Sequence, residues 1–184
     1  MYEYAVLEYA FSFWQWQNAT CQDIPSGSEP DSVLFRHLTR VIPFSMYSDR
    51  GVAYYAPFMY QAYTELGYYC YDITDFRGLL KAVKNPSNDI FAPDGPNLKF
   101  NCATMHAIYD WLQNRGDRII YVYGGNDAWS ATSMQLNGTT DALKLVKKGG
   151  SHRTRIRNLP VEYQELARRK LEEWLGVSIE DWTE

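Results

Sequence analysis

Hydrophobic residues recur at intervals of three and four positions through the first half of this chain, which is the spacing of amphipathic helices. The series opens with Tyr4, Leu7, Phe11 and Trp14. Further helices are predicted over 31–42, 48–66 and 76–83, each ending at or near a proline or glycine. Residues 68–73 read as a short strand or as extended chain. Residues 1–96 are therefore expected to form a mainly helical region.

A different pattern follows a connection rich in proline, because short apolar runs now alternate with helices. The run at 119–123 has no polar break and predicts a strand buried on both faces, and the apolar run that begins at Leu143 predicts a second strand over 143–147. Helices are expected over 101–116 and between 160 and 176. The first of these helices should face inward with Met105, Ile108, Tyr109 and Leu112. Residues 97–184 are thus expected to close an α/β domain, with a few parallel strands flanked by helices.

Composition argues against several classes of protein. The net charge is −4 with no long run of either sign, so nucleic-acid binding is not expected. No apolar stretch approaches the roughly 18 residues of a membrane span. Cys21, Cys70 and Cys102 lack the paired spacing of a zinc or redox motif, so they are expected as buried thiols or with two of them in a disulfide. No metal or other cofactor is predicted.

The two predicted strands end in the same way, with a glycine pair followed by a polar loop. The first strand leads through Gly-Gly-Asn to Asp127, and the second leads through Gly-Gly-Ser to His152. An acid after one strand and a histidine after the next is the order of the last two members of an α/β-hydrolase triad. In such a triad the histidine takes a proton from the nucleophile and the carboxylate fixes its tautomer. The spacing is equally compatible with Asp127 capping a turn and His152 being an ordinary loop histidine.

Three blocks of the sequence resemble the secreted bacterial prolyl tri- and tetrapeptidyl aminopeptidases. They are Tyr123-Gly-Gly-Asn-Asp-Ala-Trp-Ser130, Gly150-Ser-His152 and the opening segment from Glu3 to Gln15. Those enzymes are serine peptidases with an α/β-hydrolase fold and a helical cap. The resemblance implies that Asp127 is the triad acid, that His152 is the base, that the substrates are peptides and that the protein is secreted or periplasmic. Ala128 departs from the pattern, because a proline is expected after the acid.

The nucleophile of such a triad has no counterpart in this sequence. A nucleophile elbow needs a Gly-x-Ser-x-Gly-like turn between a strand and a helix, and none occurs. Ser26 and Ser28 flank Gly27, but they lie in a polar loop with no buried strand before it. The chain is therefore expected to be the C-terminal part of a serine exopeptidase that releases short peptides from substrate N-termini. The missing N-terminal hydrolase half would supply the serine, and this part alone should be inactive.

Two residues outside the acid and the base are candidates for substrate binding. Glu8 lies among aromatic residues of the first helix and would bind a substrate ammonium group if that helix lines a cleft, but a solvated surface glutamate is the alternative. Trp129 follows the acid and would pack the acid loop or wall the cleft. Arg155 lies in a run of alternating arginines after the histidine, expected either as a solvated edge or as a contact to substrate or an acidic partner.

Two other functions stay open at this point. The first is a non-catalytic binding or assembly module derived from a hydrolase, which the absence of an upstream nucleophile would favour. The second is a metal-dependent hydrolase that uses His152 and Asp127 with His37 or His106. It ranks last, because the three histidines form no H-x-x-x-H or H-x-H pair.

Overall fold

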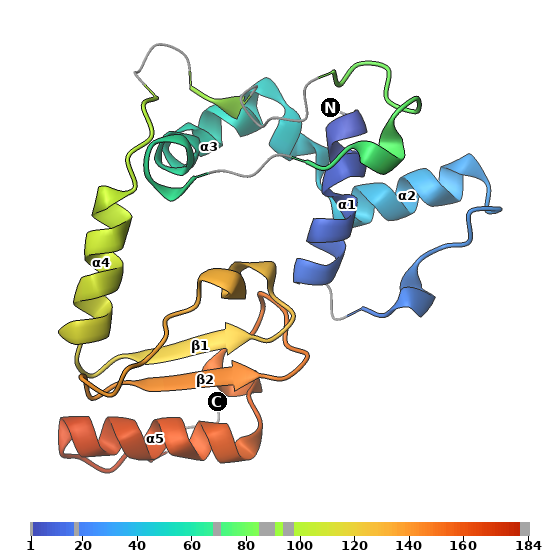
Figure 1. Cartoon of the computed structure of the whole chain (residues 1–184). Helices are drawn as coiled ribbons and strands as arrows, with labels where there is room; N and C mark the ends of the chain where they lie inside the picture. Colours follow the sequence, from blue (N-terminus) through green and yellow to red (C-terminus); the bar gives the residue numbers. More distant parts are fainter. Residues whose placement is uncertain (1, 17–18, 68–70, 85–90, 94–97, 181–184) are drawn as a thin grey trace. The chain divides into compact units, whose positions relative to one another are not determined.

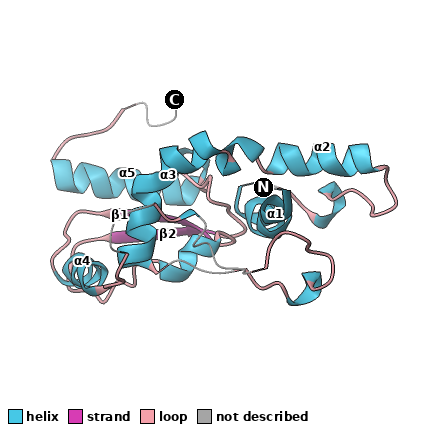
Figure 2. Cartoon of the chain, turned by 90° about the horizontal axis from the view of Figure 1, so that it is seen from above, coloured by secondary structure: helices cyan, strands magenta, loops and turns pink. Residues whose placement is uncertain are grey.

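The computed structural model describes residues 2–16, 19–67, 71–84, 91–93 and 98–180 (Figure 1). These residues are mostly helical, and the strands among them form a two-stranded parallel sheet (Figure 2). The chain divides into two compact units. Unit 1 comprises Met1–Phe13 and Ala19–His106, and unit 2 comprises Trp14–Asn18 and Ala107–Glu184.

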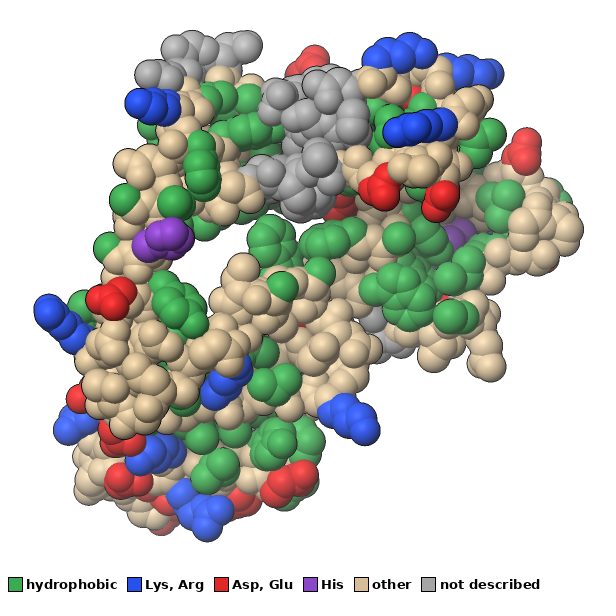
Figure 3. Space-filling model, viewed as in Figure 1, with side chains coloured by type: hydrophobic (Ala, Val, Ile, Leu, Met, Phe, Trp, Pro, Cys, Tyr) green, Lys and Arg blue, Asp and Glu red, His purple; other side chains and the backbone are tan. Residues whose placement is uncertain are grey.

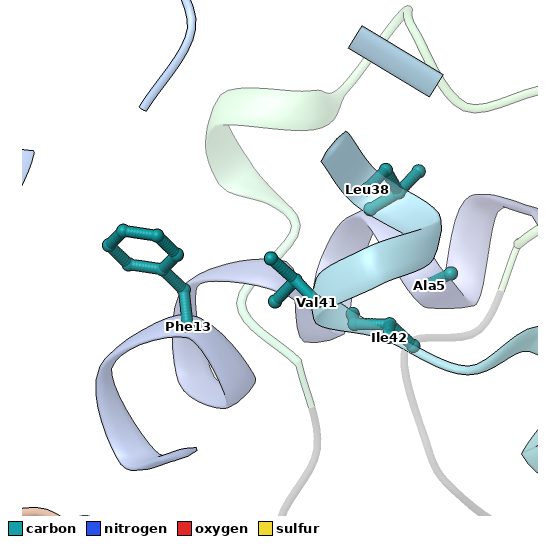
Figure 4. Packing of buried hydrophobic residues seen from close by; sticks show 5 residues of the cluster. All are labelled: Ala5, Phe13, Leu38, Val41 and Ile42. Atoms are coloured by element: carbon teal, nitrogen blue, oxygen red, sulfur yellow. The ribbon is translucent and has the colours of Figure 1, made fainter. Parts of the chain in front are cut away.

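Unit 1 is built around the first two helices of the chain, α1 (Tyr2–Trp16) and α2 (Asp31–Val41). Both helices were predicted from their hydrophobic spacing. A buried cluster joins them, as Figure 4 shows, and its members are Ala5, Phe13, Leu38, Val41 and Ile42. A second cluster forms on another side of α1 from Tyr4, Val83 and Phe91. Because Tyr4 and Ala5 are neighbours in sequence, α1 contributes to both cores of this unit.

The third helix, α3 (Asp49–Gln61), also follows the prediction. The Ser48 hydroxyl oxygen caps it by accepting the Gly51 N–H at 3.1 Å. The helix passes into one π-helical turn over Ala62–Leu66 and ends at Gly67, whose φ of 77° is the left-handed conformation that glycine adopts most readily.

The helix predicted over 76–83 is wrong. A 3₁₀ turn spans Thr74–Phe76, and Gly78 then takes a φ of 89°, which a right-handed helix does not allow. The backbone N–H groups of residues 81–83 donate to the carboxylate of Glu3 at 2.7 to 3.1 Å. These bonds lower the pKa of Glu3, with the Val83 N–H contributing most. A tertiary contact has therefore taken the donors that a helix would have used.

The fourth helix, α4 (Ala103–Asn114), begins as predicted, with the Ala103 N–H donating to the Asn101 side chain at 3.0 Å. Its predicted inward face is wrong. None of its residues is buried, and Ile108 and Tyr109 are 45% and 37% exposed. The apolar positions of an amphipathic helix are present, but the described part of the chain does not cover the face that they form.

Unit 2 carries the sheet, in which β1 (Ile120–Gly124) pairs in parallel with β2 (Leu143–Lys147). The register joins Ile120 to Leu143 and Gly124 to Lys147. One face of the sheet packs against α5 (Val161–Leu175), which begins after Pro160 and ends at Gly176 as predicted (Figure 1). The buried residues of this layer are Leu145, Leu159 and Ala167. β1 was predicted to be buried on both faces, but its first four residues are half-buried because β2 is its sole partner among the described strands.

Charged side chains gather over α5 in the face shown in Figure 3, whereas hydrophobic side chains reach the surface in both units. Ion pairs follow the helix, with Arg168 contacting Glu165 and Glu172 at 2.7 Å each. No helix among the described residues has the length and apolar character to span a bilayer. Cys21 and Cys102 are free thiols, and Cys70 lies outside the described residues.

Candidate active site

The acid loop and the histidine loop leave the sheet side by side, because Gly124 and Lys147 are register partners at the ends of β1 and β2. Two backbone hydrogen bonds then join the loops. The Gly125 N–H donates to the Lys147 carbonyl at 2.8 Å, and the Asn126 N–H donates to the Gly150 carbonyl at 2.9 Å. The parallel sheet therefore fixes where both loops start, and these two bonds hold them together beyond it.

Gly124 is the point of closest approach between the two loops. A Cβ at this position would overlap the backbone carbonyl oxygens of Gly150 and Ser151. Its φ is not positive, so the requirement for glycine is one of space and not of backbone conformation. Gly124 thus has a packing role, which is to let the histidine loop lie against the end of β1.

Asp127 uses its two carboxylate oxygens for two different purposes. One accepts the Trp129 N–H at 3.1 Å and caps a short 3₁₀ helix over Ala128–Thr132. The other lies 2.7 Å from Nδ1 of His152. The side chain of Asp127 is only 9% exposed. Both readings of Asp127 that the sequence allowed, a turn cap and a partner of the histidine, are therefore present at once.

His152 is held on several sides. Its backbone N–H donates to the Gln15 carbonyl at 2.9 Å, and its own carbonyl accepts the Arg155 guanidinium at 2.9 Å. Arg155 is exposed, as expected for a solvated edge, but its guanidinium is also bound within the loop, since it donates to the Thr154 carbonyl at 2.7 Å as well. With Nδ1 bound to Asp127, the other ring nitrogen, Nε2, has no hydrogen-bond partner among the described residues, and the side chain is 35% exposed. The imidazole thus presents one nitrogen to the carboxylate and keeps the other available.

The buried polar residues around the histidine complete the loop. Ser151 and Thr154 are 5% and 7% exposed, and the Thr154 hydroxyl donates to the Ser151 carbonyl at 2.7 Å. Gly150 lies close to the Thr154 hydroxyl, so a side chain there would displace it. The loop is therefore a tight turn and not a flexible connection, which agrees with a fixed orientation of His152.

The other residues that the sequence suggested for a site lie outside the Asp127–His152 pair. Trp129 lies two residues after the acid and is 40% exposed. Glu8 belongs to unit 1, where its carboxylate accepts the Tyr71 hydroxyl at 2.7 Å, so it is not a bare surface glutamate. His37 and His106 also belong to unit 1. His37 bonds to the Tyr9 hydroxyl at 2.7 Å, and burial lowers its pKa.

The described residues contain no group of three or more His, Cys, Asp and Glu side chains placed to hold a metal ion. Sequence reasoning predicted that Asp127 and His152 belong to one site but missed the contacts that fix the histidine, namely Gln15 and the guanidinium of Arg155. The signal that the sequence offered for these contacts is that Gln15 lies in the opening segment, one of the three blocks that resemble the peptidase family.

Comparison with known proteins places the sequence in a family. A model of the PS-10 peptidase S37 family matches residues 1–184. The chain is also similar to a prolyl tri/tetrapeptidyl aminopeptidase of Streptomyces mobaraensis, with 26% identity over 183 residues. That alignment covers 96% of this chain but only 38% of the relative, so the chain spans well under half of the relative's length. No solved structure matches the chain with significance. The match over its full length shows that the chain belongs to the PS-10 peptidase S37 family.

Proposed function

We propose that this chain supplies the acid and the base of a Ser-His-Asp triad in a serine exopeptidase that releases short peptides from substrate N-termini. The observation that carries the proposal is the 2.7 Å pairing of Asp127 with Nδ1 of His152, with Nε2 left available. Membership of a peptidase family and likeness to a named prolyl aminopeptidase support it. The prolyl preference comes from that relative's name alone.

In this mechanism a serine hydroxyl approaches Nε2 of His152. The hydroxyl oxygen attacks the scissile carbonyl while Nε2 takes its proton, and the resulting imidazolium is stabilised by the Asp127 carboxylate. Nε2 then returns the proton to the leaving amine as the acyl-enzyme forms. Water hydrolyses the ester in a second round in which His152 again acts first as base. Each role requires that Nδ1 stay bound to Asp127 throughout.

The serine belongs to a segment outside this chain. Among the described residues, no serine hydroxyl lies within hydrogen-bonding distance of Nε2. The Ser26 and Ser28 hydroxyls bond to each other at 2.8 Å in unit 1, and the Ser130 hydroxyl donates to the Gly124 carbonyl at 2.7 Å. We therefore expect the nucleophile and its oxyanion hole in the N-terminal half of a longer protein, and we expect no activity from this chain alone.

The α/β-hydrolase fold is part of the same proposal. Two parallel strands with a helix packed on one face are compatible with the closing part of such a domain. A two-stranded parallel sheet is rarely complete by itself. Within the described residues, β1 has a strand partner on one edge only. The Tyr121 hydroxyl on β1 is buried without a hydrogen-bond partner there. Further strands beside β1 would supply a neighbour for both features.

Residues 1–96 would then be the helical cap and residues 97–184 the hydrolase part. In the cap, Glu8 is our candidate for binding the substrate ammonium, since the Tyr71 hydroxyl that it accepts would hold the carboxylate in one orientation. Trp129 is our candidate for a wall beside the acid. We expect the full protein to be secreted or periplasmic.

The test is release of a reporter from an N-terminal tripeptide substrate by the full-length protein and its variants. His152→Ala should reduce kcat by on the order of 10³-fold or more. The matched control is His106→Ala, which removes an exposed histidine of α4 by the same substitution and should leave kcat unchanged. Equal activity of the His152→Ala variant and the parent would refute the triad. A full-length protein without any peptidase activity would favour a binding module instead.

A further inference from the structure

Unit 2 includes a short piece of chain from far upstream. Residues Trp14–Asn18 group with the sheet and its loops, although the rest of α1 belongs to unit 1. Gln15 is only 4% exposed, and its carbonyl accepts the His152 N–H at 2.9 Å. The last four carbonyls of a helix have no partner within it, and α1 ends at Trp16. The histidine loop therefore satisfies one of the free carbonyls at the end of α1.

The next residue of the helix contacts the imidazole itself. The rings of Trp16 and His152 have their centroids 4.6 Å apart with an interplanar angle of 72°, which is an edge-to-face arrangement. Trp16 is 39% exposed, so its ring lies partly over the histidine and partly in solvent. The ring contact and the backbone bond come from adjacent residues, so the end of α1 holds both the main chain and the side chain of His152.

We propose that Gln15 and Trp16 are positioning residues for His152. An imidazole ring rotates broadly about its last torsion, and a half turn would replace Nδ1 by a carbon opposite Asp127. The hydrogen bond to Asp127 opposes this rotation on one side of the ring. The indole of Trp16 opposes the rotation on another side, because the imidazole would have to displace the indole ring as it turns. Nε2 is thereby aimed in one direction.

This inference deepens the proposed function and rests on it for its kinetic consequences. A base that is misdirected by about 1 Å loses roughly 100-fold in rate, whereas substrate affinity need not change. Trp16→Ala should therefore lower kcat by about 10 to 100-fold in the full-length protein and leave KM within about twofold. Trp16→Phe keeps an aromatic ring at the site and should recover most of the lost kcat. Trp16→Leu keeps apolar bulk without a planar ring and should recover less.

The control for a general loss of tryptophan is Trp111→Ala, which removes a ring that is 50% exposed on α4. It should leave kcat unchanged. Thermal unfolding of each variant checks that the fold is retained, and Trp16→Leu keeps the test meaningful if Trp16→Ala unfolds. If kcat of the folded Trp16→Leu variant equals that of the parent and of Trp16→Phe, the positioning role is overturned.

A measurement without turnover separates this inference from the proposed function. In NMR spectra of the 184-residue chain, the ring protons of His152 should shift when Trp16 is replaced by leucine, because the indole ring current is lost. The proton on Nδ1 should exchange faster with solvent as its bond to Asp127 loosens. Unchanged His152 signals would overturn the inference even if His152 proves catalytic. Changed signals, together with a full-length protein that has no peptidase activity, would uphold the contact and refute the triad.

Discussion

A methyl group at Gly124 is the smallest change that should disable the site without touching the acid or the base. The Cβ of Gly124→Ala would overlap the carbonyl oxygens of Gly150 and Ser151, which are backbone atoms and cannot rotate away. The histidine loop must therefore move from the end of β1. A displacement on the order of 1 Å is needed to restore ordinary contact, and a misplacement of that size costs about 100-fold in rate. Asp127 stays where it is, so the distance to His152 Nδ1 must grow.

The stability of the variant follows from two opposing effects. Forcing a methyl group into packed backbone costs about 1–3 kcal/mol. Replacing glycine by alanine at a position without positive φ also restricts the unfolded chain, which stabilises the protein by about 0.4–1 kcal/mol. The net loss should be about 0–2.6 kcal/mol, which lowers the unfolding midpoint without abolishing the fold. A large loss of activity with a modest loss of stability is the expected signature.

The assay compares kcat/KM and chemical unfolding of the full-length protein with those of Gly124→Ala. Gly27→Ala is the matched control, since Gly27 also lacks positive φ and a Cβ there would meet nothing within 4 Å. The control should be as active as the parent and equally or slightly more stable. If Gly124→Ala keeps more than about half of the parental kcat/KM while the fold is intact, the packing of the two loops does not set the geometry of His152.

Three further predictions concern individual side chains. Asp127→Asn should lower kcat by on the order of 10³ to 10⁴-fold in the same assay with little change in unfolding, because the amide oxygen can still cap the turn but the tautomer of the histidine is lost. Glu8→Gln should raise KM for substrates with a free N-terminus and not for N-acetylated ones; equal KM changes would remove Glu8 from substrate binding. The Lys170 ammonium and then the Trp174 indole N–H lower the pKa of Asp141 below its ordinary 3.8. This carboxylate should therefore stabilise unit 2 above about pH 4 and lose that effect as pH falls through its lowered pKa, an acid dependence of Tm that Asp141→Asn should reduce.

The acid and the histidine were predictable because their placement is local. Each follows a strand of β-branched and apolar residues, and parallel neighbours in a sheet deliver their following loops to one edge. The order of the two loops along the chain then agrees with the resemblance of the 123–130 block to a peptidase family. That local order was enough to predict that Asp127 and His152 lie near each other, and the structure has them 2.7 Å apart.

The predictions that were wrong depended on contacts between distant residues. Residues 76–83 have a helical pattern, but the Glu3 carboxylate takes the N–H groups of 81–83, and no local signal marks a glutamate near the start of the chain as their acceptor. The apolar positions of α4 predicted a buried face that the described residues leave exposed. The contacts of Gln15 and Trp16 with His152 also join residues that are distant in the sequence. The pattern of a helix shows which face is apolar, but it does not show which segment will cover that face.

The same distinction bears on the proposed function, in which this chain supplies the acid and the base but not the nucleophile. The Asp127–His152 pair depends on two adjacent strands, one tight glycine and the end of one helix, all within unit 2. Its geometry is therefore set before any serine arrives. The serine side is different, because Nε2 has no hydrogen-bond partner among the described residues. In the proposed function this chain orients the base, whereas the segment that meets Nε2 would supply the nucleophile and with it the choice of bond that is cleaved.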